Sequence, residues 1–517
     1  MPNAKAPTHV SIMDTTLRDG EQTPHLAFTP SEKLHIARSL ILDVGVDRIE
    51  VASTGVSSGE REATGRVLAW AREAGCAERI EVLGFCDGQR SARWMAELGG
   101  GAMNLLLKGS ESHCRRQLGL EPEQHFNALE RTLQAARDLG VPIAGAYLED
   151  WSRGIAESPD YVMAATARLR ALHVPRIYLA DTLGCLSPAH VASHVKRMVD
   201  AFPGQHFEFH GHNDYGLATA NALAAVAAGA RGVHTSVNGL GERAGNARLA
   251  EVAVALRDHA GVSCNVNEAA VTGIASLVET FSGKPIAHNA PLTGRDVFTQ
   301  TAGVHADGDR KGQLYASRLS PDRFGRRRDY ALGKLSGHAS LDQNLEQLGI
   351  RLEKEQRSRL LARVVELGDQ KQTIHPSDLP LLVHDLFGDP RFEAQRYPRI
   401  TDYRVTIARA SAARGELTLR FGERTITTRA EGTGGYDALV AALRTAMEEF
   451  DLQLPALTDF RVRIPPSGGP SALVEASIEW SHCDERFTTV GVDPDQLGAA
   501  IIATQKMLAR VCTPGVI

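Results

Sequence analysis

The chain has 517 residues, a formal charge of −5 at pH 7 and seven scattered cysteines without a C-x-x-C pair. Its length predicts roughly two to four domains, and the lack of a basic excess argues against nucleic acid or an anionic membrane as the main partner. The cysteine pattern argues against a disulfide framework or a zinc-thiolate site, and no membrane-spanning run or signal peptide is evident, so we expect a cytoplasmic protein.

Eight short apolar runs, rich in β-branched residues, recur along the first half of the chain, with segments of helical spacing between them. The runs span residues 10–20, 48–53, 79–85, 102–109, 142–150, 176–184, 206–214 and 232–241. Helix start signals support the intervening segments: Thr29 or Ser31 can cap one helix, and Ser187 before Pro188 can start another. Eight strand–helix units predict an α/β fold of the (β/α)8 TIM-barrel type. A doubly wound sheet is less favoured, because the first turn, T-L-R-D-G-E-Q, lacks the glycine-rich phosphate pattern.

Polar residues gather where the predicted strands end, which is where barrel enzymes carry their catalytic groups. Residues two apart on a strand point to the same face, so His210 and His212 of the seventh run would project side by side. Such a pair can share a metal ion, although a bare H-x-H is more often a pair of surface histidines. Asp19 would add a carboxylate and Asn246 an amide oxygen, and this mixed set suits zinc, manganese or magnesium.

Three further residues at strand ends suggest chemistry on a carbonyl group. Arg18 can stabilise the oxyanion that forms when a metal-polarised carbonyl carbon is attacked. Thr182 can hold a substrate carboxylate, or it can be an ordinary cap or turn threonine. Glu149 can act as a base or orient one, or it can be a solvated loop carboxylate.

Two stretches of this chain resemble the signatures of the acetyl-CoA-dependent α-isopropylmalate, homocitrate and citramalate synthases. They are L-R-D-G-E-Q with Lys33 after ten further residues, and F-E-F-H-G-H-N-D-Y-G-L-A-T-A. A third stretch, N-G-L-G-E-R-A-G-N, resembles the strand-eight turn of the same metal-dependent barrel superfamily. The resemblance implies that Arg18 and Thr182 contact a 2-oxo acid. It also implies a divalent metal held by Asp19, His210 and His212, with Asn246 close to it.

The chemistry of that family agrees with the residues at the strand ends. A 2-oxo acid chelates the metal, a base removes a proton from the methyl group of acetyl-CoA, and the enolate attacks the keto carbon. Hydrolysis of the thioester then drives the reaction forward, so the resemblance implies an acyltransferase. The base stays open between Glu149 and His305, which lies in A-G-V-H-A-D-G.

The pattern changes near residue 275, and we expect three parts: a barrel over 1–275, partly helical linker subdomains over 276–395, and a regulatory domain over 396–517. The linker resembles a family segment that crosses to the neighbouring protomer of a homodimer. His305, Asp307 and Tyr315 would then approach the partner's active site. The basic run R-F-G-R-R-R can hold the phosphates of coenzyme A, although an ion-paired surface is the commoner role of such runs.

Residues 401–517 contain a weak internal repeat of two βββα units, which predicts an α+β domain with one shared core. The domain resembles the family's regulatory domain, where the end-product amino acid binds. Isoleucine or leucine is therefore expected as a feedback inhibitor. The glycines of G-T-G-G (432–435) can direct backbone amides at the ligand's carboxylate, or they can simply form a turn.

The choice among 2-oxo acids depends on the pocket for their side chain. Leu83, Leu106 and Tyr147 match positions that close this pocket around the methyl group of pyruvate in citramalate synthases. The resemblance therefore implies (R)-citramalate formation for isoleucine biosynthesis. The alternative is 2-isopropylmalate synthase, which uses 2-oxoisovalerate for leucine biosynthesis, because one methylene discriminates by only about 1–3 kcal/mol. Homocitrate synthase is less favoured, because two leucines offer nothing to a second carboxylate.

Two other classes of protein remain as alternatives. A metal-dependent acyl-CoA lyase on the same barrel would cleave rather than condense, and it would not need the C-terminal repeat. An inactive amino-acid sensor would need no catalytic residues, whereas Arg18, Asp19, His210 and His212 are all present.

Overall fold

The computed structural model describes residues 7–312, 314–369, 374–387, 397–409, 411–463, 474–483 and 485–511. The chain forms two compact units, Met1–Phe298 with Ser317–Arg327, and Thr299–Ala316 with Arg328–Ile517. The expected boundary between residues 395 and 396 lies outside the described residues.

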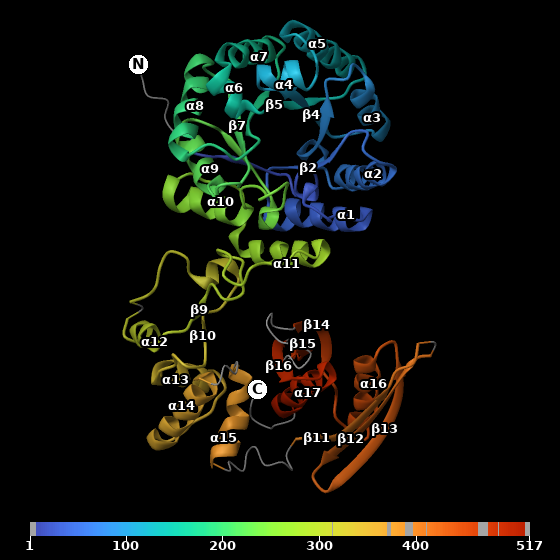
Figure 1. The fold of residues 1–517 in the computed structure, drawn as a ribbon, viewed down its shortest axis with the longest axis vertical. Coiled ribbons are helices and arrows are strands. Elements are labelled where there is room, and N and C mark those ends of the chain that lie inside the picture. Colours follow the sequence, from blue (N-terminus) through green and yellow to red (C-terminus); the bar gives the residue numbers. More distant parts are fainter. Residues whose placement is uncertain are drawn as a thin grey trace. The chain divides into compact units, whose positions relative to one another are not determined.

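The first unit is a closed barrel of eight parallel strands, which confirms the predicted fold (Figure 1). The barrel closes where β1 pairs with β8, with Ser11 opposite Gly232. The strands are β1 Ser11–Asp14, β2 Arg48–Ser53, β3 Ile80–Phe85, β4 Ala102–Lys108, β5 Ile143–Glu149, β6 Arg176–Asp181, β7 His206–Gly211 and β8 Gly232–Thr235. Several predicted runs extend past these strands, and the first continues as a loop that carries Arg18 and Asp19.

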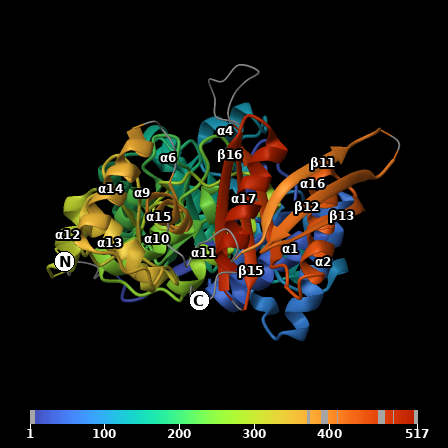
Figure 2. The ribbon, with the colours of Figure 1, turned by 90° about the horizontal axis from the view of Figure 1, so that it is seen from below.

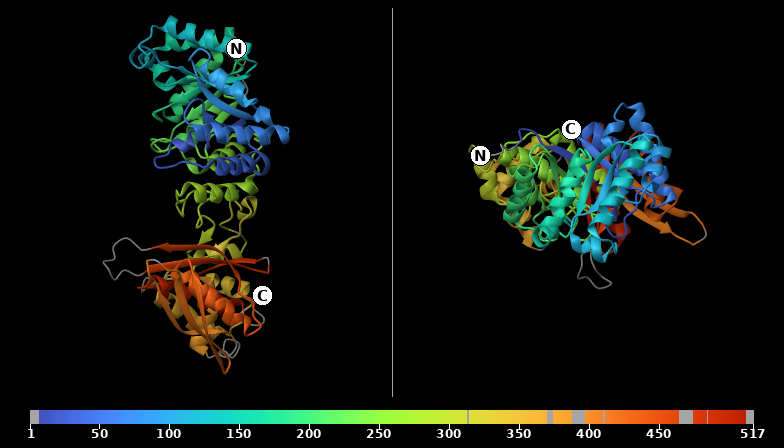
Figure 3. Two further views of the ribbon diagram at one scale, coloured as in Figure 1. Left: turned by 90° about the vertical axis from the view of Figure 1, so that its right-hand side faces the viewer. Right: turned by 90° about the horizontal axis from the view of Figure 1, so that it is seen from above.

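Helices surround the barrel, and Figure 3 shows them from two further sides. Thr29, not Ser31, caps α1 and forms a capping box with Glu32, while the Ser187 hydroxyl accepts a hydrogen bond from the His190 backbone at the start of α8. The helices of this unit are α1 Pro30–Arg38, α2 Ser58–Glu73, α3 Arg90–Leu98, α4 Glu111–Arg116, α5 Pro122–Asp138, α6 Trp151–Glu157, α7 Pro159–Ala171, α8 Pro188–Ala201, α9 Ala218–Ala227, α10 Leu249–Ala255 and α11 Val271–Ser282.

Charged side chains occupy part of the barrel interior, where branched apolar residues are usual. Arg48 on β2 pairs with Glu81 on β3 at 3.0 Å and with Glu208 on β7 at 2.7 Å. Asn104 on β4 donates hydrogen bonds to Glu81 and Glu50, both at 2.8 Å. Buried charges are tolerated when they are paired in this way, so the strands are joined inside the barrel by ionic as well as apolar contacts.

The second unit begins with the linker, in which β9 Thr299–Gln300 pairs with β10 Asp329–Tyr330. Its helices are α12 Gly303–Arg310, α13 His338–Gln347, α14 Lys354–Asp369 and α15 Leu379–Phe387. Leu341, Leu360 and Val364 belong to a separate small apolar core. These helices agree with the partly helical character expected of the linker.

The C-terminal domain consists of two βββα halves, as the repeat predicts (Figure 2). The first half contains β11 Arg399–Thr406, β12 Ala413–Phe421, β13 Arg424–Gly432 and α16 Gly435–Glu448. The second contains β14 Ala456–Arg463, β15 Val474–His482, β16 Glu485–Asp493 and α17 Gln496–Val511. Leu417 and Leu419 from the first half share one buried cluster with Ile478 and Trp480 from the second, so the halves share a core.

Within the part of the chain that the structure describes, no helix combines the length and the apolar character needed to cross a membrane. The six cysteines described there are free thiols.

Candidate metal centre and substrate pocket

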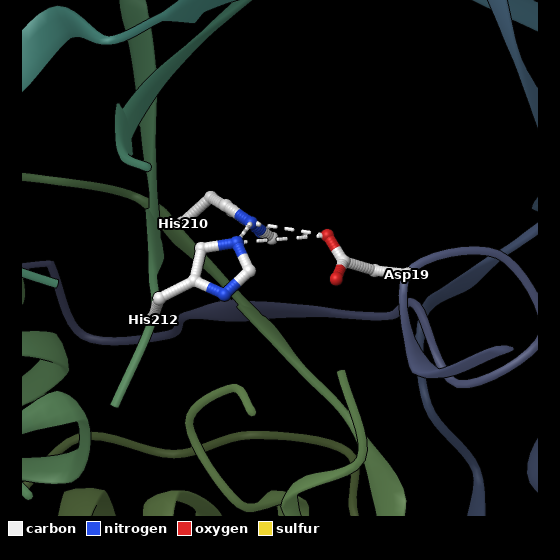
Figure 4. Close-up of side chains that lie close together, drawn as sticks. All are labelled: Asp19, His210 and His212. Atoms are coloured by element: carbon white, nitrogen blue, oxygen red, sulfur yellow. Dashed lines mark hydrogen bonds and ion pairs between the residues drawn. The ribbon is translucent and has the colours of Figure 1, made fainter. Parts of the chain in front are cut away.

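Asp19, His210 and His212 converge at the C-terminal end of the barrel (Figure 4). Asp19 Oδ2 lies 3.4 Å from His210 Nε2 and 3.9 Å from His212 Nε2. The two Nε2 atoms are 3.4 Å apart. All three side chains are buried, so their ligand atoms face one shared point rather than solvent.

Asn246 completes this group. Its amide nitrogen donates hydrogen bonds to Asp19 Oδ1 at 3.1 Å and to the Leu240 carbonyl at 3.0 Å. Its buried Oδ1 atom has no hydrogen-bond partner among the described residues. An unpartnered buried acceptor is costly, and this atom makes Asn246 a candidate for a further ligand.

The protonation states suit metal binding. Burial lowers the pKa of His212 to about 4, so its ring is neutral near pH 7 and keeps a lone pair. Burial opposes the ionisation of Asp19, but Arg18 and His210 outweigh it and hold the pKa of Asp19 well below its usual range. One carboxylate, two imidazoles and one amide oxygen form a donor set that fits a divalent cation such as zinc, manganese or magnesium.

Arg18 is fixed in three directions beside this centre. Its Nη1 atom lies 2.8 Å from Asp19 Oδ2, its Nε atom 2.5 Å from Glu50 Oε2, and its Nη2 atom 3.2 Å from the Tyr147 hydroxyl. The sequence analysis missed Glu50. A signal was present, because Arg48 and Glu50 alternate on a strand whose other positions are mostly apolar.

Lys33 anchors the loop that carries Arg18 and Asp19. In the sequence this lysine was noted only as part of a motif. Its ammonium group is buried and donates to the carbonyls of Leu17 at 3.0 Å and Val51 at 3.2 Å. It also pairs with Glu21 and Glu60, both at 2.6 Å. One cation therefore joins the loop to β2 and to α2.

Thr182 follows β6 and accepts a hydrogen bond from the Asp150 backbone N–H at 2.8 Å. Asp150 has a left-handed φ of 63°, which is uncommon for a residue other than glycine. Its carboxylate is held by the Ser110 hydroxyl at 2.7 Å. Since the Thr182 oxygen already accepts one bond, its hydroxyl hydrogen is left for another acceptor.

The three expected pocket residues lie together. Leu83 and Tyr147 belong to a buried cluster with Met13, Tyr178 and Ala180, and Leu106 packs against it. In the sheet register Leu106 is opposite Tyr147, and Lys108 is opposite Glu149. Glu149 forms an ion pair with Lys108, a partner that the sequence analysis did not anticipate.

His305, Asp307 and Tyr315 lie in the second unit, not in the barrel unit. The rings of His305 and Tyr315 are in contact, with centroids 4.2 Å apart. Asp307 pairs with Lys311 at 2.6 Å. Both contacts lie within the second unit.

The basic run 323–328 makes mostly internal contacts. Arg323 pairs with Glu268 at 2.8 Å and Asp258 at 3.0 Å, and Arg328 pairs with Asp309 at 2.5 Å. Arg326 donates to backbone carbonyls, including that of Gly294 at 2.6 Å. The ion-paired alternative therefore describes Arg323 and Arg328, while Arg326 is held by backbone carbonyls.

Three family models match the chain. They are HMGL-like over residues 9–278, homocitrate synthase post-HMGL domain-like over 292–372, and LeuA allosteric (dimerisation) domain over 373–512. A putative (R)-citramalate synthase of Methanopyrus kandleri is 33% identical over 92% of this chain and 91% of its own. A probable 2-isopropylmalate synthase of the same organism is 32% identical over 98% and 99%. A homocitrate synthase of Sulfurisphaera tokodaii is 35% identical over 69% and 76%.

Proposed function

The chain belongs to the HMGL-like family, and on that premise we propose that it condenses acetyl-CoA with pyruvate to give (R)-citramalate. Relatives named as citramalate, isopropylmalate and homocitrate synthases support the condensation of acetyl-CoA with a 2-oxo acid. The observation that supports pyruvate is the apolar cluster that brings Leu83, Leu106 and Tyr147 together, with the Tyr147 hydroxyl bonded to Arg18.

A divalent cation held by Asp19, His210, His212 and Asn246 would polarise the keto group of the 2-oxo acid as a Lewis acid. Arg18 lies beside Asp19 and can donate to the oxygen on which negative charge develops. The Thr182 hydroxyl, already oriented by Asp150, can donate to the substrate carboxylate. These contacts hold the keto carbon where an enolate can attack it.

Proton removal from the methyl group of acetyl-CoA is assigned to Glu149 or His305. Glu149 lies at the end of β5, two residues beyond Tyr147 and on the same face of the strand. Its ion pair with Lys108 restrains the position of the carboxylate. His305 lies on α12 and would reach a site from the linker, in the same chain or in a partner.

The second candidate is 2-isopropylmalate synthase, favoured by the relative that spans 98% of this chain. The pocket is apolar, so it would reject an isopropyl group by size and not by polarity. Size discrimination of this kind is worth about 1–3 kcal/mol for one methylene. The expected preference for pyruvate is therefore large but not absolute.

The test is thiol release from acetyl-CoA by the purified enzyme with Mg²⁺, Mn²⁺ or Zn²⁺ and a panel of 2-oxo acids. Pyruvate is expected to give the highest kcat/KM, with (R)-citramalate as the product on chiral chromatography. An advantage of tenfold or more for 2-oxoisovalerate would transfer the assignment to isopropylmalate synthesis. Absence of thiol release with every 2-oxo acid would refute condensation altogether.

The match to a LeuA allosteric (dimerisation) domain supports a homodimer with feedback regulation, and we propose isoleucine as the inhibitor. The G-T-G-G stretch is not simply a turn. A Cβ atom on Gly432 would lie 2.5 Å from the Ala438 nitrogen, so this glycine allows close packing of β13 against α16. The Thr433 amide already donates to Asp437 at 2.8 Å, which leaves fewer amides for a ligand.

A further inference from the structure

We infer that His234, fixed by Glu208, is a positioning residue that anchors Tyr147 and thereby contributes to the choice among 2-oxo acids. The inference rests on the proposed function, because it concerns the same substrate pocket. His234 was not among the candidate residues in the sequence. It lies on β8, across the barrel from Tyr147 on β5.

Two hydrogen bonds hold the His234 ring inside the barrel. Its Nε2 atom lies 3.0 Å from Glu208 Oε2, and its Nδ1 atom lies 3.2 Å from the Tyr147 hydroxyl. The ring also packs edge-on against Tyr147 and Tyr178, with centroid distances of 5.4 and 4.7 Å. The His234 side chain is fully buried, so water does not compete for either nitrogen.

The direction of these bonds follows from the charges around Glu208. Both oxygens of Glu208 accept hydrogen bonds from Arg48 Nη2 at 2.7 Å, so the carboxylate is part of a buried ion pair. A carboxylate paired in this way only accepts hydrogen bonds, so Nε2 of His234 carries the hydrogen. In the neutral ring, which carries one hydrogen, Nδ1 is then an acceptor.

The Tyr147 hydroxyl has one hydrogen and two neighbouring acceptors, Glu50 Oε2 at 3.1 Å and His234 Nδ1 at 3.2 Å. Glu50 already receives Arg18 on Oε2 and Asn104 on Oε1. Among the described residues, Nδ1 of His234 has no donor other than Tyr147. The single hydroxyl hydrogen is therefore shared between Glu50 Oε2 and His234 Nδ1 as a three-centre hydrogen bond.

The anchor matters because the Tyr147 ring packs in one cluster with Leu83 and Leu106, the residues of the proposed substrate pocket. A ring tied at its hydroxyl to Arg18, Glu50 and His234 cannot withdraw from the substrate methyl group. A released ring would admit one more methylene. That difference is worth about 10–200-fold in kcat/KM when a pocket enforces it fully.

The experiment compares His234→Leu, His234→Asn, Tyr147→Phe and the double variant His234→Leu/Tyr147→Phe. The readout is the ratio of kcat/KM for 2-oxobutanoate to that for pyruvate. His234→Leu is expected to raise this ratio by about tenfold and to raise KM for pyruvate. His234→Asn should fall between it and wild type, because an amide oxygen can take the place of Nδ1.

The Tyr147→Phe background shows whether His234 acts through the hydroxyl. There, His234→Leu should change the ratio no further, whereas an additive change would overturn the anchor. If His234→Leu does not fold, an unaltered ratio in both Tyr147→Phe and His234→Asn overturns it equally. Urea unfolding of wild type, His234→Leu, Tyr147→Phe and the double variant measures the coupling without substrate. A wild-type enzyme that condenses no 2-oxo acid would refute the proposed function. The coupling between His234 and Tyr147 in the free energy of unfolding would still show whether their hydrogen bond exists.

Discussion

The side-chain amide of Asn246 donates a hydrogen bond to Asp19 Oδ1 at 3.1 Å, and its buried oxygen has no hydrogen-bond partner among the described residues. One residue therefore orients a carboxylate and offers an acceptor of its own. This relationship depends on the loop after β8 meeting the loop after β1, since the two residues are 227 positions apart in the chain.

The first prediction concerns metal binding. Asp19→Ala and His210→Ala should abolish condensation and lower the bound metal, because each removes a charged or strongly donating ligand. Asn246→Ala should weaken Mn²⁺ binding by about 10–100-fold, the effect typical of residues that orient metal ligands. Metal content after dialysis and Mn²⁺ titration measure both effects. His190→Ala, on the exposed face of α8, is the control, and unchanged metal affinity in His210→Ala would remove the metal-site assignment.

The second prediction concerns the buried ammonium of Lys33. Lys33→Met should lower the free energy of unfolding by about 3–5 kcal/mol, because it leaves Glu21 and Glu60 without their shared cation. Arg61→Met is the matched control. It removes an exposed pair with Glu97 and should cost about 0–1 kcal/mol. Equal losses in urea unfolding would show that Lys33 contributes no more than a surface residue.

The third prediction is an acid dependence of stability. Burial, reinforced by Lys108, lowers the pKa of His125 from 6.5 to about 4, and its Nε2 atom accepts a hydrogen bond from the Lys108 backbone. The unfolded chain binds this proton more readily, so stability should fall as the pH drops from about 6.5 toward 4, by at most about 3 kcal/mol from this group. His125→Gln keeps an acceptor without a titratable ring and should flatten that part of the profile in metal-free protein. An identical pH profile for the two proteins would contradict the assignment.

The fourth prediction tests whether sites are shared between protomers. Arg18→Ala and His305→Ala are each expected to be inactive, but mixed dimers should recover part of the activity if His305 serves the partner's barrel. Native mass spectrometry can verify that mixed dimers have formed. No recovery in verified mixed dimers would confine His305 to its own chain's site or place it outside the chemistry.

The fifth prediction concerns regulation by the C-terminal domain. Isoleucine should inhibit the intact enzyme, and coupling of this kind is typically about 1–3 kcal/mol in binding. Titration with isoleucine and with leucine, followed by calorimetry and turnover, distinguishes the two amino acids. Stronger inhibition by leucine than by isoleucine would favour the isopropylmalate alternative. If neither amino acid binds or inhibits, the proposed role of the domain is limited to dimerisation.

The barrel could be predicted because its signal is local. Each strand is a short apolar run, and caps such as Ser187 mark the helices that follow. The convergence of His210 with His212 is equally local, because residues two apart on a strand share a face. Asp19 was expected at a strand end, whereas it lies in the loop that follows β1.

The supporting residues of the site could not be assigned from sequence. Glu50 binds Arg18 from 32 positions away, and Glu208 binds His234 only because β7 and β8 are adjacent in the barrel. Such pairs depend on strand register and side-chain direction. A charged residue inside an apolar strand, as in R-I-E-V-A-S, is the signal that a buried partner exists, but it does not name the partner.

The ionic interior also has a consequence for how the barrel assembles. Arg48 and Glu208 are 160 positions apart, and the arginine also needs Glu81 from a third strand. Until β2, β3 and β7 enclose one space, any partly closed intermediate would hold a desolvated charge without its counterion, which is strongly unfavourable. A fragment that ends before β7 would lack that counterion permanently. The first unit should therefore gain its order in a single cooperative step, late in synthesis, once the strand that carries Glu208 has joined the others.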